Sequence, residues 1–171
     1  ISQANRRVRI DLAGGILKAT ALSVSAIDLD GSTSRPSISV VGPGRFDGSN
    51  LVNSPGIASG SYLQLDNFDN VTVNLLEFFA GGFGDGTGDS AIVVGQCRRV
   101  TITSNHFRGW EDHGIYFSGP ALGSSLKSED AIVSGNQFSN LSGAVRLARQ
   151  FESFVISGNI FTSVYNAVIA L

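Results

Sequence analysis

The sequence predicts an all-β fold of the solenoid type, in which short parallel strands wind into about five to six stacked coils. Segments with an apolar residue at every second position recur along the chain, and their spacing is that of a structural repeat. No long segment shows the apolar stripe of an amphipathic helix. Glycine supplies 21 of the 171 residues and charged residues only 15%, as expected for short strands and tight corners.

The first repeated strand ends at a phenylalanine. The phenylalanines recur at similar intervals, and they are Phe46, Phe78, Phe107, Phe138 and Phe161. Five positions before each stands a β-branched residue, namely Val41, Val73, Ile102, Val133 and Ile156. Two positions further upstream are Ser39, Val71, Val100, Ala131 and Phe154. Because stacked coils bury one another's inward residues, we expect the phenylalanines to form one inward aromatic stack.

A second strand follows each phenylalanine after a gap of variable length. Its alternating apolar pairs are Leu63/Leu65, Ile92/Val94, Ile115/Phe117, Val145/Leu147 and Val168/Ala170. The shortest repeat, from Phe138 to Phe161, suits one coil of three short strands, and the longer repeats carry loop insertions. Upstream, residues 7–12 alternate like a first strand, and residues 26–29 are expected to be an earlier member of the second ladder.

Asparagine recurs two positions before the phenylalanine in three successive coils, at Asn105, Asn136 and Asn159. Asparagine tolerates left-handed backbone, and its amide can bond to the same residue in the coils above and below. We therefore expect an asparagine ladder at a tight corner of the solenoid.

The whole chain, residues 1–171, is interpreted as one solenoid segment. Residues 1–37 are less regular and residues 38–171 form the regular coils. The chain opens without Met and stops at an apolar run, residues 167–171, with no polar cap after it. We therefore interpret it as part of a longer polypeptide.

Composition excludes several classes of partner and site. The formal net charge is −2 and no basic block occurs, so we expect no nucleic-acid partner. No apolar run approaches the roughly 18 residues of a membrane span, so we expect no membrane insertion. The single cysteine, Cys97, cannot form an internal disulfide or a zinc site. No motif indicates a cofactor.

The clearest candidates for catalysis are acidic residues just before the second strand. Asp89 and Asp112 stand three positions before Ile92 and Ile115, so direct stacking of the strands would place their carboxylates about 5 Å apart. Two carboxylates that close raise each other's proton affinity, which gives one acid and one base or nucleophile for glycosidic cleavage. Glu111 adjoins the pair, and the predicted catalytic residues are Asp89, Glu111 and Asp112.

The candidate sugar-binding residues are Trp110, His113, Tyr116 and Arg146. Trp110 adjoins the acids, and an aromatic face packs well on a sugar ring. The outward residues of the second ladder are Gln64, Val93, Tyr116, Arg146 and Ile169, among which Tyr116 over Arg146 could bind an acidic sugar. A lyase would need a basic residue, for which Lys127, Arg146 and Arg149 are the candidates.

Each of these residues also has a plainer interpretation. Asp residues often cap turns, so the glycine-rich stretch at residues 81–89 could be an ordinary loop. The outward row is apolar enough to be an oligomer interface, and His113 by itself fits a hydrogen-bonded surface residue. A calcium site built from Asp85, Asp89, Glu111 and Asp112 is an alternative, but no calcium-loop spacing is present and we assign no metal.

Three segments resemble coils of the right-handed parallel β-helix superfamily, which includes pectate lyases, polygalacturonases, phage tailspikes and capsule depolymerases. They are Val-Thr-Ile-Thr-Ser-Asn-His-Phe at 100–107, Ile-Val-Ser-Gly-Asn-Gln-Phe at 132–138 and Val-Ile-Ser-Gly-Asn-Ile-Phe at 155–161. The resemblance covers roughly residues 38–171 and implies a right-handed, single-stranded parallel β-helix. This fold hosts lyases, hydrolases, epimerases and non-enzymatic adhesins, so fold alone does not give function.

Within the superfamily, residues 40–48, Val-Val-Gly-Pro-Gly-Arg-Phe-Asp-Gly, are similar to the glycine-rich coil of polygalacturonase-like chains. Glu111-Asp112 stands where those enzymes have paired Asp, and their Asn-Thr-Asp, Gly-His-Gly and Arg-x-Lys motifs are absent. The chain is closest in character to tailspikes, whose catalytic residues vary more.

The tailspike resemblance implies a homotrimer, on a virion tail or otherwise extracellular, that binds a cell-surface polysaccharide and in one version hydrolyses it. Two alternatives stay open. One is a non-enzymatic shaft or adhesin, and the other is a secreted enzyme of the polygalacturonase or lyase type.

Overall fold

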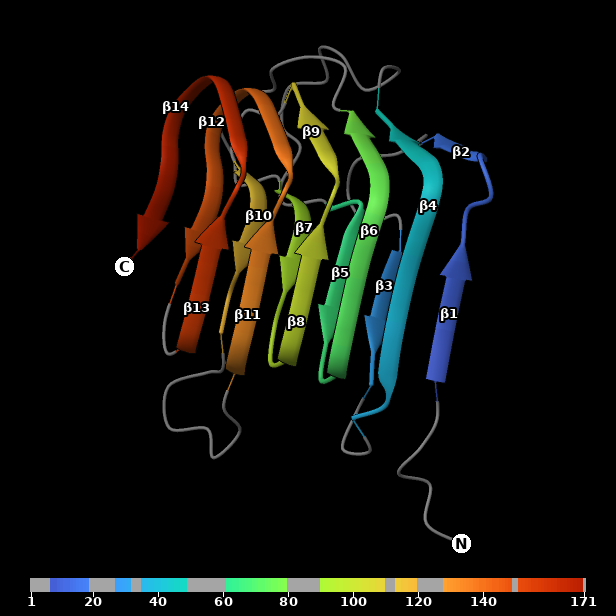
Figure 1. Ribbon diagram of the computed structural model, residues 1–171. Helices are drawn as coiled ribbons and strands as arrows, with labels where there is room; N and C mark the ends of the chain where they lie inside the picture. The colour runs from blue at the N-terminus through green and yellow to red at the C-terminus, as the bar shows by residue number, and fades with distance from the viewer. Residues whose placement is uncertain are drawn as a thin grey trace, which may run out of the picture.

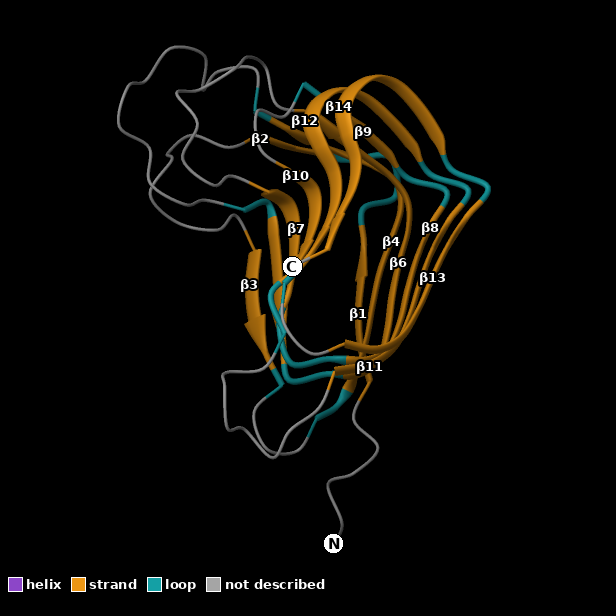
Figure 2. Ribbon diagram, turned by 90° about the vertical axis from the view of Figure 1, so that its left-hand side faces the viewer, coloured by secondary structure: helices purple, strands orange, loops and turns teal. Residues whose placement is uncertain are grey.

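The computed structural model describes residues 7–18, 27–31, 35–48, 61–79, 90–109, 113–119, 128–148 and 151–170. All regular structure in these residues is β-strand, and every pairing between the strands is parallel. Figure 2 shows the walls that the strands form around a common interior, and Figure 1 shows that the strands within one wall lie side by side in the order of the chain, as β6 (Asp69–Phe79), β8 (Arg98–Thr103), β11 (Ser128–Ser134) and β13 (Phe151–Ser157) do. These segments include no helix that could span a membrane.

The strands form three faces, and each face takes one strand from each of six coils in the described residues. The first face contains β1 (Arg7–Asp11), the start of β4 (Ser37–Asp47), the start of β6 (Asp69–Phe79), β8 (Arg98–Thr103), β11 (Ser128–Ser134) and β13 (Phe151–Ser157). The second face contains β2 (Ile16–Lys18), the ends of β4 and β6, β9 (His106–Arg108), and the starts of β12 (Gln137–Leu147) and β14 (Ile160–Ala170). The third face contains β3 (Ile27–Asp30), β5 (Leu63–Asp66), β7 (Ser90–Val94), β10 (His113–Phe117) and the ends of β12 and β14.

The predicted aromatic stack forms the inward side of the second face. Its members are Phe46, Phe78, Phe107, Phe138 and Phe161, and neighbouring ring centroids are 4.9, 5.0, 4.9 and 5.4 Å apart with nearly parallel planes. These distances match the spacing of paired strands. The first four phenylalanines are fully buried, so the stack is the centre of the hydrophobic core.

The second predicted ladder is also confirmed, and it lines the third face. Ile92 pairs with Leu63 and with Ile115, and Val145 pairs with Ile115 and Val168. The predicted early members are present too, because β3 pairs with β5 and β1 pairs with β4.

The predicted register of β4, the strand that ends at Phe46 and Asp47, is wrong by one position. Val40, not Val41, lies opposite Val73, and Ile38, not Ser39, lies opposite Val71. The cause is an irregularity between Val41 and Gly44 that takes an extra residue out of the ladder. Gly42 sits inside it, where an added Cβ would collide with the Leu75 carbonyl oxygen. A single insertion exchanges inward and outward positions, which a count back from Phe46 cannot detect.

The asparagine ladder is confirmed, but the left-handed backbone lies one position earlier than expected. The φ angles of Ser104, Gly135 and Gly158 are 56°, 64° and 62°. The asparagine that follows each of them points inward and bonds to the neighbouring coils. The backbone N–H of Asn105 donates to Asn136 Oδ1 at 2.9 Å, and that of Asn136 donates to Asn159 Oδ1 at 2.9 Å.

Candidate functional site

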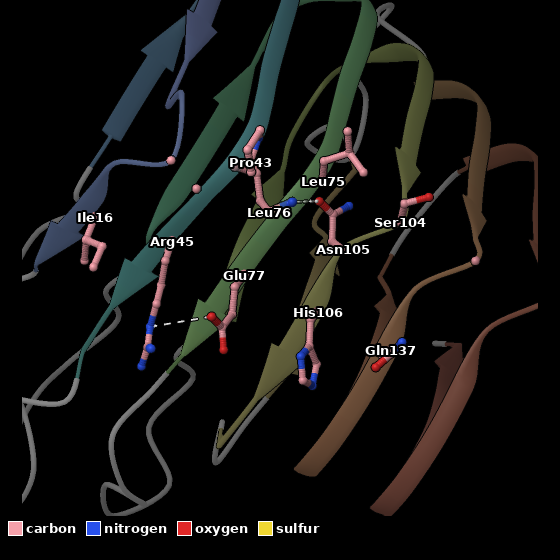
Figure 3. A pocket seen from close by; sticks show the side chains of 13 residues that line it. Ile16, Pro43, Arg45, Leu75, Leu76, Glu77, Ser104, Asn105, His106 and Gln137 are labelled. Atoms are coloured by element: carbon pink, nitrogen blue, oxygen red, sulfur yellow. Dashed lines mark hydrogen bonds and ion pairs between the residues drawn. The ribbon is translucent and has the colours of Figure 1, made fainter.

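An open groove of about 640 Å³ follows the corner between the first and second faces. Figure 3 shows the side chains that line it. One outward row crosses five coils in register, and its members are Ile16, Arg45, Glu77, His106 and Gln137. The groove therefore runs along the solenoid axis and carries a cation, a carboxylate, an imidazole and an amide at successive steps of about 4.8 Å.

The stack of phenylalanines fixes these residues on the outside. Side chains alternate between the two sides of a strand, so the residues immediately before and after each buried phenylalanine point outward. The residues before it form the row that lines the groove. The residues after it form a second outward row, which is Asp47, Phe79, Arg108 and Ser139 in register.

Glu77 is held by arginines from the coils on both sides. Its Oε1 is 2.8 Å from Arg108 Nη2, and its Oε2 is 3.8 Å from Arg45 Nε. Arg45 also lies 3.7 Å from Asp47 Oδ2 through Nη2. Both oxygens of Glu77 thus contact cations, and the carboxylate serves to orient the two guanidinium groups.

Phe79 separates the same two arginines. The guanidinium carbon of Arg45 lies 4.7 Å from the centre of the Phe79 ring, and that of Arg108 lies 4.6 Å from it. Such cation–π contacts stabilise the cations by about 0.5–1 kcal/mol at exposed sites. We name Arg45, Glu77, Phe79 and Arg108 the Phe79 cluster; its members hold one another in fixed orientations beside the groove.

His106 continues the row beyond the Phe79 cluster. Its Nε2 is 3.3 Å from Ser139 Oγ in the next coil. Burial lowers the pKa of His106, and this effect outweighs the opposing influence of Glu77. At neutral pH the ring is therefore mostly uncharged, with one nitrogen that donates and one that accepts. Together with the amide of Gln137 it offers mixed donors and acceptors, which suits a ligand rich in hydroxyl groups.

The predicted catalytic residues Asp89, Glu111 and Asp112 lie outside the described residues, as do Trp110 and Asp85. The strands that follow the acids pair as expected, with Ser90 opposite His113 and Ile92 opposite Ile115. The closeness of the carboxylates themselves stays a prediction. In the described residues no group of three or more His, Cys, Asp or Glu could hold a metal ion.

The predicted outward row of the third face is confirmed in full. Gln64, Val93, Tyr116, Arg146 and Ile169 lie opposite one another in successive coils. All five are half-buried. The guanidinium carbon of Arg146 lies 5.2 Å from the centre of the Tyr116 ring. Lys127 and Arg149, the other candidate lyase bases, lie outside the described residues.

His113 is not the surface residue that its plainer interpretation required. It is only 5% exposed, because it has the same inward parity as Ile115 and Phe117 on β10. Its ring centre is 6.4 Å from that of Tyr116. Its predicted part in sugar binding stays a prediction.

Sequence patterns did not single out Arg45, Glu77, Phe79, His106 or Arg108. The signal that could have found them is the repeat, because the residues flanking each stacked phenylalanine must share the outer surface. Compared across the coils, those two positions give a charged and aromatic set on an otherwise weakly charged chain.

Comparison with curated proteins and with solved structures found no match. A family model described as "Right handed beta helix region" matches residues 21–171. This range contains the six-stranded third face and most of the other two. With its parallel strands and stacked core, the chain belongs to the right-handed parallel β-helix family.

Proposed function

We propose that this β-helix binds a polysaccharide along the groove of its second face. The observation that carries the proposal is the row Arg45, Glu77, His106 and Gln137, which lies in register beside an open groove. Planar polar groups of this kind donate and accept hydrogen bonds in the plane of neighbouring sugar hydroxyls. Sites for small molecules are usually enclosed, so an open groove fits a polymer better.

The shape of the groove supports an extended ligand. It crosses five coils from Ile16 to Gln137, which corresponds to about 19 Å at the usual strand spacing. The Phe79 cluster makes one side of this path rigid, so little side-chain entropy would be lost on binding.

The biological setting we propose is that of a tailspike-like protein, on a virion tail or otherwise extracellular, acting as a homotrimer on a cell-surface polysaccharide. Family membership supports this setting only in a general way, because the fold hosts several functions. In the enzymatic version, Asp89, Glu111 and Asp112 hydrolyse the glycosidic bond, and the in-register pairing of the strands that follow them supports it.

A non-enzymatic shaft or adhesin is the second candidate. The observation that favours it is the mutual pairing within the Phe79 cluster, where both Glu77 oxygens contact arginines. A carboxylate used in this way orients neighbours and is not free for acid–base chemistry. The Phe79 cluster would then contribute to binding and not to cleavage.

Isothermal titration with capsular and O-antigen polysaccharide fragments tests the binding proposal. Replacing two lining side chains, His106→Gln with Gln137→Ala, should weaken binding about tenfold, since each lost hydrogen bond is worth about 0.5–1.5 kcal/mol. The matched control is Thr72→Ala with Thr101→Ala, two outward residues of the first face. If the groove variant binds every fragment as tightly as the control does, the groove is not the binding site.

Cleavage is tested separately, by measuring oligosaccharide release from the same polysaccharides. In the enzymatic version Asp112→Asn should stop the release while binding in the groove is retained. Release that continues at the wild-type rate would remove the three carboxylates from the mechanism.

A further inference from the structure

Arg146 differs from the other half-buried arginines. The described part of the chain contains five of them, and four contact a carboxylate. Those four are Arg35 and Arg98 at Asp69, and Arg45 and Arg108 at Glu77. Arg146, the fifth, has no carboxylate partner among the described residues. Its Nε is buried and has no hydrogen-bond partner there, which is also true of Arg35, Arg45 and Arg108, so the missing carboxylate is what sets Arg146 apart.

The ring of Tyr116 positions this guanidinium without neutralising it. The guanidinium carbon of Arg146 lies 5.2 Å from the ring centre, so the cation is stacked and partly removed from water. A partly desolvated cation without a counter-ion is unfavourable. An oxyanion placed against the free edge of the guanidinium would remove that cost with two parallel charge-assisted hydrogen bonds.

The neighbours in the same outward row strengthen such a contact. Val93 and Ile169 lie one coil beyond Tyr116 and Arg146 at either end, and both are half-buried and apolar. Apolar walls lower the local dielectric constant and strengthen an ion pair. Asp28, the carboxylate of this row, is four coils from Arg146, about 19 Å away at the usual strand spacing.

Packing of this face against other copies of the chain would not supply the missing anion. In a trimer whose solenoids run parallel to the symmetry axis, each coil meets the same coil of its neighbours. Arg146 would then face Arg146, and Asp28 would remain four coils distant. Burying like charges together in an interface core is unfavourable.

We infer that Arg146 and Tyr116 bind an oxyanion substituent, a carboxylate or a sulfate, of a saccharide. The guanidinium takes the oxyanion, and the exposed part of the Tyr116 ring packs against the sugar. This site lies on the third face, apart from the groove of the second face. The saccharide part of the inference rests on the proposed function, whereas the oxyanion part does not.

Isothermal titration of the full chain tests the inference with four probes, namely a galacturonate trisaccharide, its methyl ester, a sulfated neutral trisaccharide and inorganic sulfate. Arg146→Gln should weaken binding of the charged saccharides at least tenfold and leave the methyl ester unchanged. Arg146→Lys should give an intermediate loss, since lysine keeps the charge but not the bidentate geometry. Tyr116→Leu should weaken the charged probes a few-fold through loss of the stacked orientation.

Arg7→Gln is the matched control, because it removes one exposed positive charge from the first face. Equal weakening by Arg7→Gln and Arg146→Gln would overturn the inference, as would equal affinity for the acid and its methyl ester. Absence of binding by both charged saccharides and sulfate at millimolar concentration would also overturn it.

A change in sedimentation coefficient caused by Arg146→Gln, without a change in affinity, would assign the face to subunit contact. The methyl ester carries no oxyanion, so its binding reports on the groove and not on Arg146. If the His106→Gln, Gln137→Ala variant loses the methyl ester, that result concerns only the groove, and the two proposals therefore fail separately.

Discussion

The side chain of Asn136 makes four hydrogen bonds inside the core. Its Oδ1 accepts from the backbone N–H and from Nδ2 of Asn105, at 2.9 and 3.1 Å. Its Nδ2 donates to the Ile102 carbonyl and to Asn159 Oδ1, at 2.9 and 3.0 Å. The residue is fully buried, so loss of the amide would leave the Asn105 backbone N–H without its acceptor and take one bond from each of the other three groups. Asn105 Nδ2 and Asn159 Oδ1 would keep their bonds to the Val73 carbonyl and to the Asn136 backbone N–H.

Replacing Asn136 by Ala should therefore lower the free energy of unfolding by roughly 2–4 kcal/mol, since each buried polar group left unpaired costs about 1–3 kcal/mol. Asn136→Asp should be destabilised as well near neutral pH, because a carboxylate would face two oxygen acceptors. Acidification should restore part of that loss, since a protonated carboxyl donates again. Urea unfolding at pH 7 and pH 4 measures both effects, and an Asn136→Ala variant as stable as the wild type would contradict the ladder's role.

His106 should make the stability of the fold depend on pH, and burial of its ring sets the sign. Burial lowers the pKa of His106 below its usual value of 6.5, so the unfolded chain binds a proton more readily than the folded chain. Stability should be unaffected by this group above pH 6.5 and should fall as the pH drops through that value towards the folded pKa. His106→Gln should remove this part of the decline.

The pKa of His106 can be measured directly by NMR, because the sequence contains only two histidines. The His106→Gln variant assigns the two signals. A titration midpoint of His106 at or above 6.5 would contradict the effect of burial.

The stacked phenylalanines show how the second-face strands hold together as elements. Phe107 lies between Phe78 and Phe138, with ring centres 5.0 and 4.9 Å away. Phe161, in the last described coil, stacks on Phe138 alone among the described rings and is 38% exposed. The same residue type therefore makes twice as many stacking contacts in β9 as in β14.

Phe107→Ala should cost about 3–5 kcal/mol, the usual range for a buried phenylalanine. Phe161→Ala should cost less than half of that, because its ring already contacts water and stacks on one neighbour. Equilibrium unfolding in urea compares the two variants on one scale. Equal losses at the two positions would show that stacking depth does not decide stability in this face.

At the scale of the individual strands, the sequence predicted most of the fold. The alternation within each strand and the recurrence of phenylalanine identified the inward residues of β6, β9, β12 and the third face. It failed at β4, where the irregularity around Gly42 shifts the ladder between Val41 and Gly44. The apolar alternation looks regular both before and after a single inserted residue. The insertion therefore becomes visible only when the strand is paired with its neighbour.

At the scale of the whole molecule, the six coils of the described residues present three outer surfaces of different character. The second face carries the groove and the Phe79 cluster, and the third face carries Tyr116 and Arg146. The net charge of −2 is small, so local pairs and not a global field determine what each face can bind. The outward row of the first face joins the small polar Thr72 and Thr101 to the exposed Ile132 and Val155, and we assign no ligand to it.

The outward row of the third face was predictable, because it needs only the register of one ladder. The Phe79 cluster was not, because it depends on how long arginine side chains from different coils fold across their neighbours. Arg45, Glu77 and Arg108 belong to three different repeats of the chain, and their contacts arise only when the coils are stacked.

The sequence by itself determined the coil repeat, the inward aromatic stack and the asparagine ladder, since these follow from alternation within a strand and recurrence between strands. Tertiary structure alone decided the register around Gly42, the pairing of each arginine and the exposure of each outward side chain. The physical reason is that the alternation of buried and exposed residues can be recognised in each strand separately. A surface site, by contrast, is made by side chains of neighbouring coils, and loops of unequal length set the relative positions of those coils.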